Sequence, residues 1–137
     1  MSLQILELDQ ALPLPIQVTR INAPFWEGLA EGRFLCNCCS NCGYLAFPPK
    51  AYCPQCSHDT MEWQQLTGNG VLYSCSTVHA APPMFGELPL QVAVVDLEEG
   101  IRLVTRLIDC EQPILDTAVK LLVTKLNNGY LFAARPQ

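Results

Sequence analysis

Two Cys-x-x-Cys pairs constrain this chain more than any other feature: Cys39 with Cys42, and Cys53 with Cys56. The tight turn of such a pair points both sulfur atoms at one centre, and two turns supply the four thiolates of a tetrahedral zinc site. Paired motifs at this spacing are a strong signal for structural zinc, whereas one motif alone would be weak. The short segment between the pairs can form a hairpin arm, so the sequence predicts a zinc ribbon.

The first pair has an alternative register, because Cys36 and Cys39 are also three residues apart. We favour Cys39 with Cys42 because Gly43 follows, and glycine readily adopts the left-handed conformation that lets such a turn reverse. Cys36 and Cys38 are then expected on the strand that enters the site. We expect them to be small buried hydrophobic side chains, and a spare ligand is the lesser alternative.

A histidine can also bind zinc, so His58 is an alternative to Cys56 as the fourth ligand. Cys56 completes a second pair with the spacing of the first. We therefore expect His58 at the surface.

Eight cysteines would also fit a disulfide scaffold. However, residues 1–20 lack a basic start followed by an apolar core, so we expect no secretory signal. The chain is also rich enough in Val, Leu and Ile to form a core without cross-links. We expect a reduced, cytoplasmic zinc protein.

The composition is that of one compact domain, or of two very small ones that share a surface. Half of the 137 residues are hydrophobic and 15% are charged. We expect no membrane span, because no apolar run is long enough. The net charge is −5 and the eight Lys and Arg residues form no block. We therefore expect no nucleic-acid binding, because it requires a basic surface.

The N-terminal third is predicted to contain an extended arm and one helix. Residues 1–20 contain two prolines that exclude a continuous helix, so we expect an arm that lies on a partner subunit or is disordered. Residues 22–32 are predicted to form a short helix with Phe25, Trp26 and Leu29 on its apolar face. We expect this face to pack on the ribbon, and the sharper hypothesis is that it binds a partner.

Most of the remaining chain has strand patterns. Residues 61–66 alternate between apolar and polar side chains and are expected to leave the metal site as a strand. Residues 68–70 are expected to be a hinge. Five further strands are predicted at residues 71–79, 90–97, 101–108, 118–126 and 130–134. Five strands with two tight hairpins favour a small closed barrel of the OB type, and a half sandwich is the alternative.

A series of short motifs runs through residues 22–136. They are Pro24-Phe25-Trp26-Glu27-Gly28, Cys39-Ser-Asn-Cys42-Gly43, Phe47-Pro48-Pro49, Cys53-Pro-Gln-Cys56, Trp63 with Gly68-Asn-Gly70, Leu88-Pro89 and Leu97-Glu-Glu-Gly100. In this order they resemble the acyl-CoA-associated family with an N-terminal helical arm, a rubredoxin-like zinc ribbon and a C-terminal OB-fold. The family usually has Gly before its fourth barrel strand, where this chain has Asp116.

The resemblance implies a mainly β chain with a short N-terminal helix and arm (1–32), a rubredoxin-like zinc ribbon (33–67) and a five-stranded OB-fold barrel (68–137). Members of this family are small partner subunits of thiolases and thiolase-like ketoacyl synthases. The resemblance thus implies a hetero-oligomeric accessory subunit that bridges enzymes and helps to complete an acyl-CoA channel. The resemblance also implies that the reactive cysteine belongs to the partner.

Little else in the sequence suggests catalysis. Four thiolates close the zinc shell, so the metal is expected to be structural. Cys75 and His79 would be roughly 13 Å apart along one strand, too far for one to activate the other. Asp96, Glu98 and Glu99 are interpreted as part of a turn. Cys110 is interpreted as a spare thiol in a loop.

The leading hypothesis is a non-catalytic zinc and OB-fold subunit of a thiolase-like acyl-transfer complex. One alternative is a module that binds single-stranded nucleic acid. Another is a stand-alone acyl-CoA-binding protein with its ligand between ribbon and barrel, under a loop with Met84 and Phe85.

Overall fold

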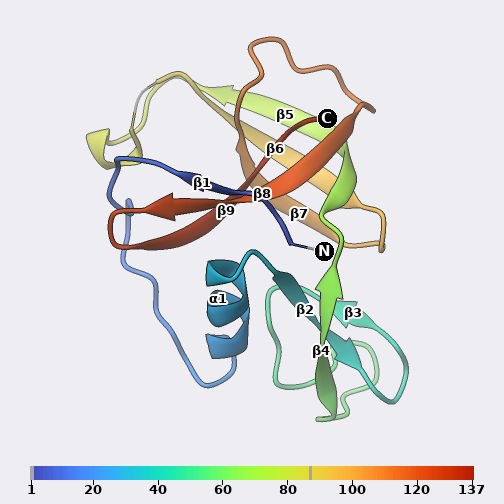
Figure 1. Ribbon diagram of the computed structural model, residues 1–137. Helices are drawn as coiled ribbons and strands as arrows, with labels where there is room; N and C mark the ends of the chain where they lie inside the picture. Colours follow the sequence, from blue (N-terminus) through green and yellow to red (C-terminus); the bar gives the residue numbers. More distant parts are fainter. Residues whose placement is uncertain (1, 87) are drawn as a thin grey trace.

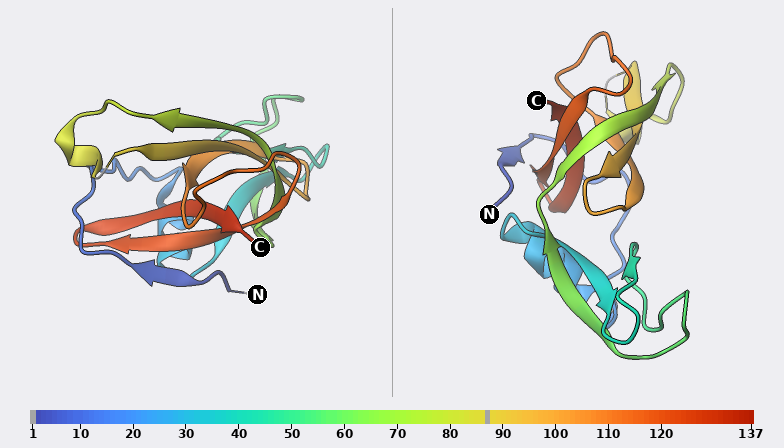
Figure 2. Two further views of the ribbon diagram at one scale, coloured as in Figure 1. Left: turned by 90° about the horizontal axis from the view of Figure 1, so that it is seen from above. Right: turned by 90° about the vertical axis from the view of Figure 1, so that its right-hand side faces the viewer.

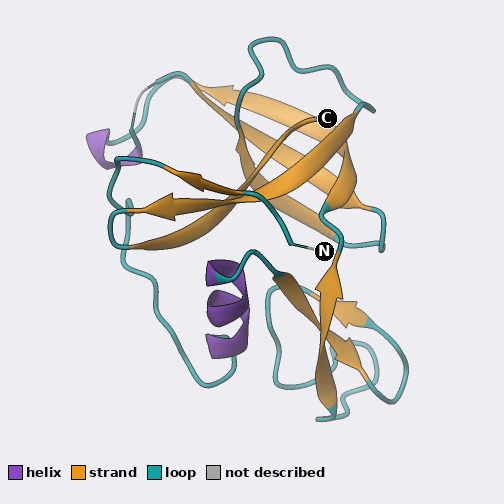
Figure 3. Ribbon diagram, in the orientation of Figure 1, coloured by secondary structure: helices purple, strands orange, loops and turns teal. Residues whose placement is uncertain are grey.

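The computed structural model describes residues 2–86 and 88–137. Met1 and Glu87, which belong to the expected arm and to the expected proline-rich loop, lie outside the described residues. The described chain is mainly β, with one short α-helix, a small ribbon sheet and a closed five-strand barrel (Figures 1 and 3). In chain order the elements are β1 (Ile5–Glu7), α1 (Ala23–Ala30), β2 (Phe34–Cys39), β3 (Leu45–Ala46), β4 (Met61–Leu66), β5 (Asn69–Val78), the 3-10 turn η1 (Pro83–Phe85), β6 (Leu90–Leu97), β7 (Arg102–Leu107), β8 (Ala118–Leu126) and β9 (Gly129–Pro136).

Helix α1 has local signals at both ends. Asn22 and Thr19 exchange two hydrogen bonds just before it, and Pro24 fits the first turn, where an N–H would have no partner. Gly32 ends the helix with a φ of 80°, in the left-handed region that favours glycine. A Cβ atom on Gly32 would lie 2.9 Å from the Leu3 carbonyl oxygen, so the close approach of the arm also requires glycine.

The ribbon sheet has the strand order β3-β2-β4, with β2 antiparallel to both neighbours. Strand β4 occupies the residues predicted for it. It runs towards the barrel and is followed by β5 after only Thr67 and Gly68 (Figure 2). The ribbon is therefore joined to the barrel by almost continuous extended chain.

The barrel has the closed strand order β5-β6-β7-β9-β8. It closes through the antiparallel pair β5–β8 and the parallel pair β7–β9. Closure confirms the expected OB-type barrel over the half sandwich. Strands β6 and β8 have the predicted bounds, and the other three differ by one or two residues at their ends. Strand β5 begins within the segment expected to be a hinge.

Aromatic rings join the helix, the ribbon and the barrel. The Phe25 ring of α1 lies 5.4 Å from the Phe34 ring of β2 and 5.5 Å from the Phe47 ring, measured between centroids. Phe132 of β9 lies 5.0 Å from Phe34. Phe25 and Leu29 are 3% and 0% exposed. The apolar face of α1 therefore packs inside this chain, which corrects the hypothesis that Phe25 and Leu29 are free to contact a partner.

The N-terminal arm also differs from expectation. Residues 5–7 form β1, which pairs in parallel with residues 123–125 of β8 (Figure 2). Leu3 is buried, and its δ carbon would lie only 2.7 Å from a Cβ atom on Gly68. The start of the arm thus extends this chain's own sheet. The reason is that β5 pairs only with residues 118–120 of β8, which leaves the edge of β8 open beyond them.

Among the described residues, no helix combines the length and the apolar character that are needed to cross a bilayer.

Hydrogen bonds to Thr67 and Asn69 fix the junction between ribbon and barrel. The Thr67 N–H donates to Glu99 Oε2 at 2.8 Å, and the Thr67 hydroxyl donates to Glu98 Oε1 at 2.6 Å. Lys120 Nζ donates to the Thr67 carbonyl at 2.7 Å and to Asn69 Oδ1 at 2.9 Å. Glu98 and Glu99 thus hold the linker, consistent with a turn role and not a catalytic pair.

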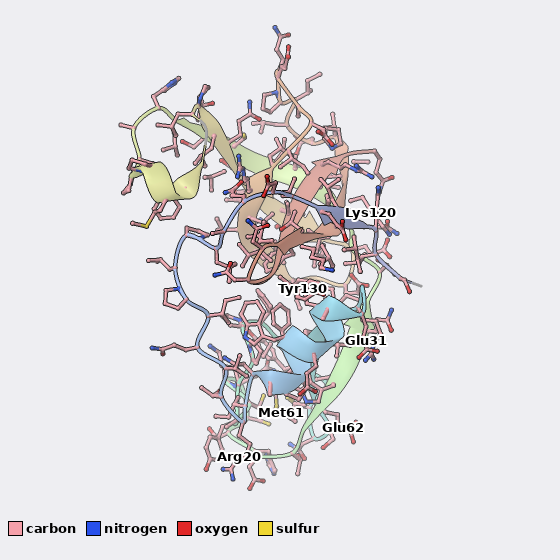
Figure 4. The ribbon with its side chains drawn as sticks, turned by 60° about the vertical axis from the view of Figure 1, so that its left-hand side comes forward. Arg20, Glu31, Met61, Glu62, Lys120 and Tyr130 are labelled. Carbon is pink, nitrogen blue, oxygen red and sulfur yellow. The ribbon has the colours of Figure 1, made fainter. Side chains whose placement is uncertain are left out.

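Replacement of Lys120, which is labelled in Figure 4, should weaken this junction. We expect Lys120→Met to lower the free energy of unfolding by roughly 1–3 kcal/mol, because two hydrogen bonds from a charged donor are lost. Lys125→Met is the control on the same strand, since its ammonium lies 3.6 Å from an exposed Glu7. Such a pair contributes at most about 1 kcal/mol. Urea denaturation of both variants would show the difference, and equal losses would contradict it.

Candidate functional site

The four paired cysteines converge at the end of the ribbon. The Sγ atoms of Cys39, Cys42, Cys53 and Cys56 all lie within 4.8 Å of one another. Cys39 Sγ is 3.5 Å from Cys56 Sγ, and Cys42 Sγ is 3.6 Å from Cys53 Sγ. Four sulfurs at a zinc–sulfur distance of about 2.3 Å stand roughly 3.8 Å apart in a tetrahedron. The cluster fits a zinc ion with all four positions filled by thiolates.

The two turns that carry these cysteines have matching backbones. The Gly43 N–H donates to the Cys39 carbonyl at 2.8 Å, and the Ser57 N–H donates to the Cys53 carbonyl at 2.9 Å. Gly43 and Ser57 have φ values of 79° and 67°. Glycine adopts this conformation without strain, as expected from the sequence, whereas serine does so at a cost of roughly 1–2 kcal/mol. The second turn is therefore the more strained of the two.

N–H groups surround the sulfur atoms of the second turn. The backbone N–H groups of Gln55 and Cys56 donate to Cys53 Sγ at 3.4 and 3.5 Å. The Asn41 side-chain amide donates to Cys56 Sγ at 3.6 Å. The backbone N–H of His58 is the main cause that lowers the pKa of Cys56, to about 5. These donors favour the thiolate form that binds metal.

The remaining cysteines of the first cluster stay outside the four-sulfur group. Cys36 is fully buried in the hydrophobic core, and burial raises its pKa to about 12, so its thiol is neutral. Cys38 is half-buried, with Sγ 3.8 Å from the Gly43 carbonyl oxygen. The side chain of His58 is exposed and lies outside the cluster. These positions match the roles expected for Cys36 and His58.

Two polar residues near the site were missed by the sequence reasoning. One is Asn41, whose side-chain amide donates the hydrogen bond to Cys56 Sγ described above. Asn37 is buried on β2, and its Oδ1 accepts a hydrogen bond of 2.7 Å from the backbone N–H of Lys50. This bond fastens the segment between the two turns to the sheet. An Asn within an otherwise apolar, cysteine-rich strand was the only available signal.

The other candidate residues form no reactive group among the described residues. Cys75 and Cys110 are half-buried against the core. Asp96 is held in an ion pair with Arg102 at 2.6 Å, and this hydrogen bond lowers the pKa of its carboxyl group. Among the described residues, His79 is not part of any group of side chains that could bind a metal ion.

The loop with Met84 and Phe85 does not lie over the ribbon. Met84 is exposed, and Phe85 lines a cavity beside β1, β8 and β9. The cavity between ribbon and barrel is lined by other residues, which include Tyr44, Phe47 and Glu99. The expected position of a ligand under this loop, between ribbon and barrel, is therefore corrected.

The fold and the cysteine cluster define a zinc-ribbon protein with an OB-fold barrel. Residues 26–62 match the family description "ChsH2, rubredoxin-like zinc ribbon domain", and residues 63–124 match "ChsH2, C-terminal OB-fold domain". The chain belongs to the DUF35 family, in the group that contains these ChsH2 domains.

Several proteins are similar to this chain. A "DUF35 domain-containing scaffold protein" of Methanocaldococcus jannaschii is 40% identical over 75 residues, which are 53% of each chain. A "Probable enoyl-CoA hydratase alpha subunit" of Thermomonospora curvata is 35% identical over 91 residues, 66% of this chain and 28% of that protein. The present chain thus spans about half of the first relative's length and less of the second's.

Two solved structures share the fold. A chain of the Ltp2-ChsH2(DUF35) aldolase has a TM-score of 0.81 and 30% identity, with 89% of this chain and 98% of that chain covered. A DUF35 protein of unknown function from Sulfolobus solfataricus has a TM-score of 0.62 and 14% identity, with 88% and 87% covered. At 14% identity, the similarity to the Sulfolobus protein supports a shared fold and nothing more.

Removal of one cluster cysteine should release the metal, whereas removal of a core cysteine should not. We expect Cys53→Ala to lose zinc, because the tetrahedral shell is left incomplete. Cys36→Ala should keep the zinc content of the unaltered protein and lose about 1 kcal/mol of stability from a small cavity. Elemental analysis of protein purified without added zinc would test both. Full zinc in the Cys53 variant, or an empty site in a folded unaltered protein, would contradict the assignment.

Proposed function

We propose that this chain is a non-catalytic accessory subunit of a thiolase-like or ketoacyl-synthase-like enzyme complex that acts on acyl-CoA or another acyl carrier. In this proposal Cys39, Cys42, Cys53 and Cys56 hold one structural zinc. The arm with the helix, the ribbon and the barrel act as one platform that bridges the enzyme subunits of a hetero-oligomer. A zinc ion bound there supplies rigidity to the end of the ribbon.

The observation that carries the non-catalytic role is the closed geometry of the sulfur cluster. A catalytic zinc keeps one position open for water or substrate. Here all four Sγ atoms lie within 4.8 Å of one another, a spacing that fits four thiolates around one zinc ion. The scaffold name of a 40% identical relative supports the same role. A substrate or water molecule could bind such a zinc ion only if one of the four thiolates dissociated from it.

The partner is proposed from the relatives. The Ltp2-ChsH2(DUF35) aldolase is a two-component enzyme by name, and another relative is named as an enoyl-CoA hydratase subunit. Both names associate this fold with larger enzymes, and the second associates it with acyl-CoA chemistry. We propose a thiolase-fold or ketosynthase-fold partner, acyl-CoA at the shared interface and a cytoplasmic location. We also propose that the boundaries between the arm with its helix, the ribbon and the barrel lie after residues 32 and 67.

The proposed contact surface is the second half of the arm together with α1. Leu14, Val18 and Ile21 are 61%, 62% and 45% exposed, which leaves large apolar side chains close together in the sequence. Beside them is a groove of about 370 Å³ between the arm, Trp26 and Tyr130, which is labelled in Figure 4. Exposed apolar patches of this kind often mark sites of protein interaction. Trp26 is the member of the predicted helix face that reaches this groove.

Substitution on this surface should weaken the complex while the fold is retained. We expect Trp26→Ala and Val18→Asp each to reduce recovery of a thiolase-fold protein when the tagged chain is purified from its native cells without denaturant. The reason is that a lost aromatic anchor or a buried charge weakens an apolar interface.

Ile114→Asp is the control, because Ile114 is equally exposed but lies in the loop between β7 and β8. Equal recovery with all variants would remove this surface from the proposal. If the unaltered chain recovers no thiolase-fold or ketosynthase-fold protein, the proposed function is wrong.

A further inference from the structure

An apolar cavity of about 390 Å³ lies on the barrel side of the molecule, away from the zinc ribbon. Strands β1, β7, β8 and β9 and the turn η1 contribute to its wall. The arm after β1 runs beside η1, since a Cβ atom on Gly86 would lie 3.1 Å from the Gln10 side chain (Figure 1). The apolar lining residues include Leu6, Leu8, Phe85, Leu90, Leu126 and Leu131.

This cavity is separate from the hydrophobic core. Leu121 and Val123 of β8 belong to the core, and side chains alternate along a strand, so Thr124 lies on the opposite face. In the sheet Thr124 is paired with Leu6 of β1 on one side and with Leu131 of β9 on the other. These three neighbours all line the cavity. The arm and η1 thus enclose space on the second face of the β8–β9 hairpin.

One hydroxyl group in the wall has no hydrogen-bond partner among the described residues. Thr124 is 6% exposed, and its hydroxyl forms no hydrogen bond with any described residue. Two other polar residues with buried side chains do have partners. Asn37 accepts from Lys50, and Thr105 donates to the Phe132 carbonyl at 3.0 Å. A ligand in the cavity could form a hydrogen bond with this hydroxyl, which would contribute roughly 0.5–1.5 kcal/mol.

The same wall contains a cation without a counter-ion. Arg106 is half-buried and has no ion pair or hydrogen bond within residues 2–86 and 88–137. Asp109, the acidic residue of the wall, is paired with Arg135 at 3.5 Å. Arg102, four residues earlier on the same strand, forms an ion pair with Asp96. The cavity therefore combines an apolar surface with one unmatched positive charge and one free hydroxyl.

We propose that this cavity binds a medium-length acyl chain that ends in a carboxylate. The acyl chain of the ligand would lie against the leucine side chains. Its carboxylate would form an ion pair with Arg106 and accept a hydrogen bond from the Thr124 hydroxyl. The volume is about thirteen times the 30 Å³ that one water occupies in the liquid, so roughly a dozen non-hydrogen atoms fit. A saturated acid such as decanoate has this size. The inference does not depend on the proposed function.

Calorimetric titration of the isolated, zinc-loaded full chain tests the site, with decanoate below its critical micelle concentration. We expect decanol, which has the chain but no charge, to bind about tenfold more weakly than decanoate. Arg106→Gln should lower decanoate affinity about tenfold and leave decanol unchanged. Arg102→Gln, on the same strand but outside the cavity, should change neither.

The Thr124→Val variant tests whether the hydroxyl group of Thr124 binds the ligand or stabilises the fold. The variant should bind decanoate about threefold more weakly, while its unliganded melting temperature should not fall because no internal hydrogen bond is lost. No binding of decanoate, equal binding of decanol, or equal effects of the two arginine variants would overturn the proposal. Each of these outcomes would leave the partner interaction proposed above untouched.

Discussion

The contact of four phenylalanine rings between the helix, the ribbon and the barrel is the interaction on which the architecture depends. Phe25 comes from α1, Phe34 and Phe47 from the ribbon, and Phe132 from the barrel. Full burial of such a side chain contributes roughly 1.5–3 kcal/mol, and edge-to-face pairs add to this. The zinc cluster stabilises only the far end of the ribbon. The rings therefore determine how the ribbon is oriented against the barrel.

That orientation is reinforced by polar contacts at the linker, and the two kinds of interaction have different consequences. Ring packing tolerates small shifts, whereas the bonds from Lys120, Glu98 and Glu99 to the linker have defined directions. A platform that is fixed in both ways can present a metal-stiffened arm and a barrel to a large enzyme at a constant angle. This property suits an accessory subunit better than a flexible tether would.

Much of this structure could be predicted from the sequence, and the exceptions share a physical cause. Gly43 identified the cysteine register, and alternation predicted β4 with its bounds. Apolar runs that end at turn residues predicted β6 and β8. Asp116 has a φ of 64°, in the left-handed region that favours glycine, the residue that the family resemblance leads one to expect there. By contrast, β1 has three residues, too few for a periodic signal, and pairs with a strand more than a hundred residues later. The cavity at Thr124 and Arg106 likewise depends on side chains from distant strands.

The parallel strand β1 has a consequence for the behaviour of the barrel in concentrated solution. An open strand edge presents unpaired N–H and C=O groups to which another polypeptide can add. Strand β1 covers the edge of β8 that β5 leaves free, and the new outer edge is three residues long and ends in Glu7. Short, charged edges discourage such addition. The first residues of the chain thus protect it against self-association through its sheet.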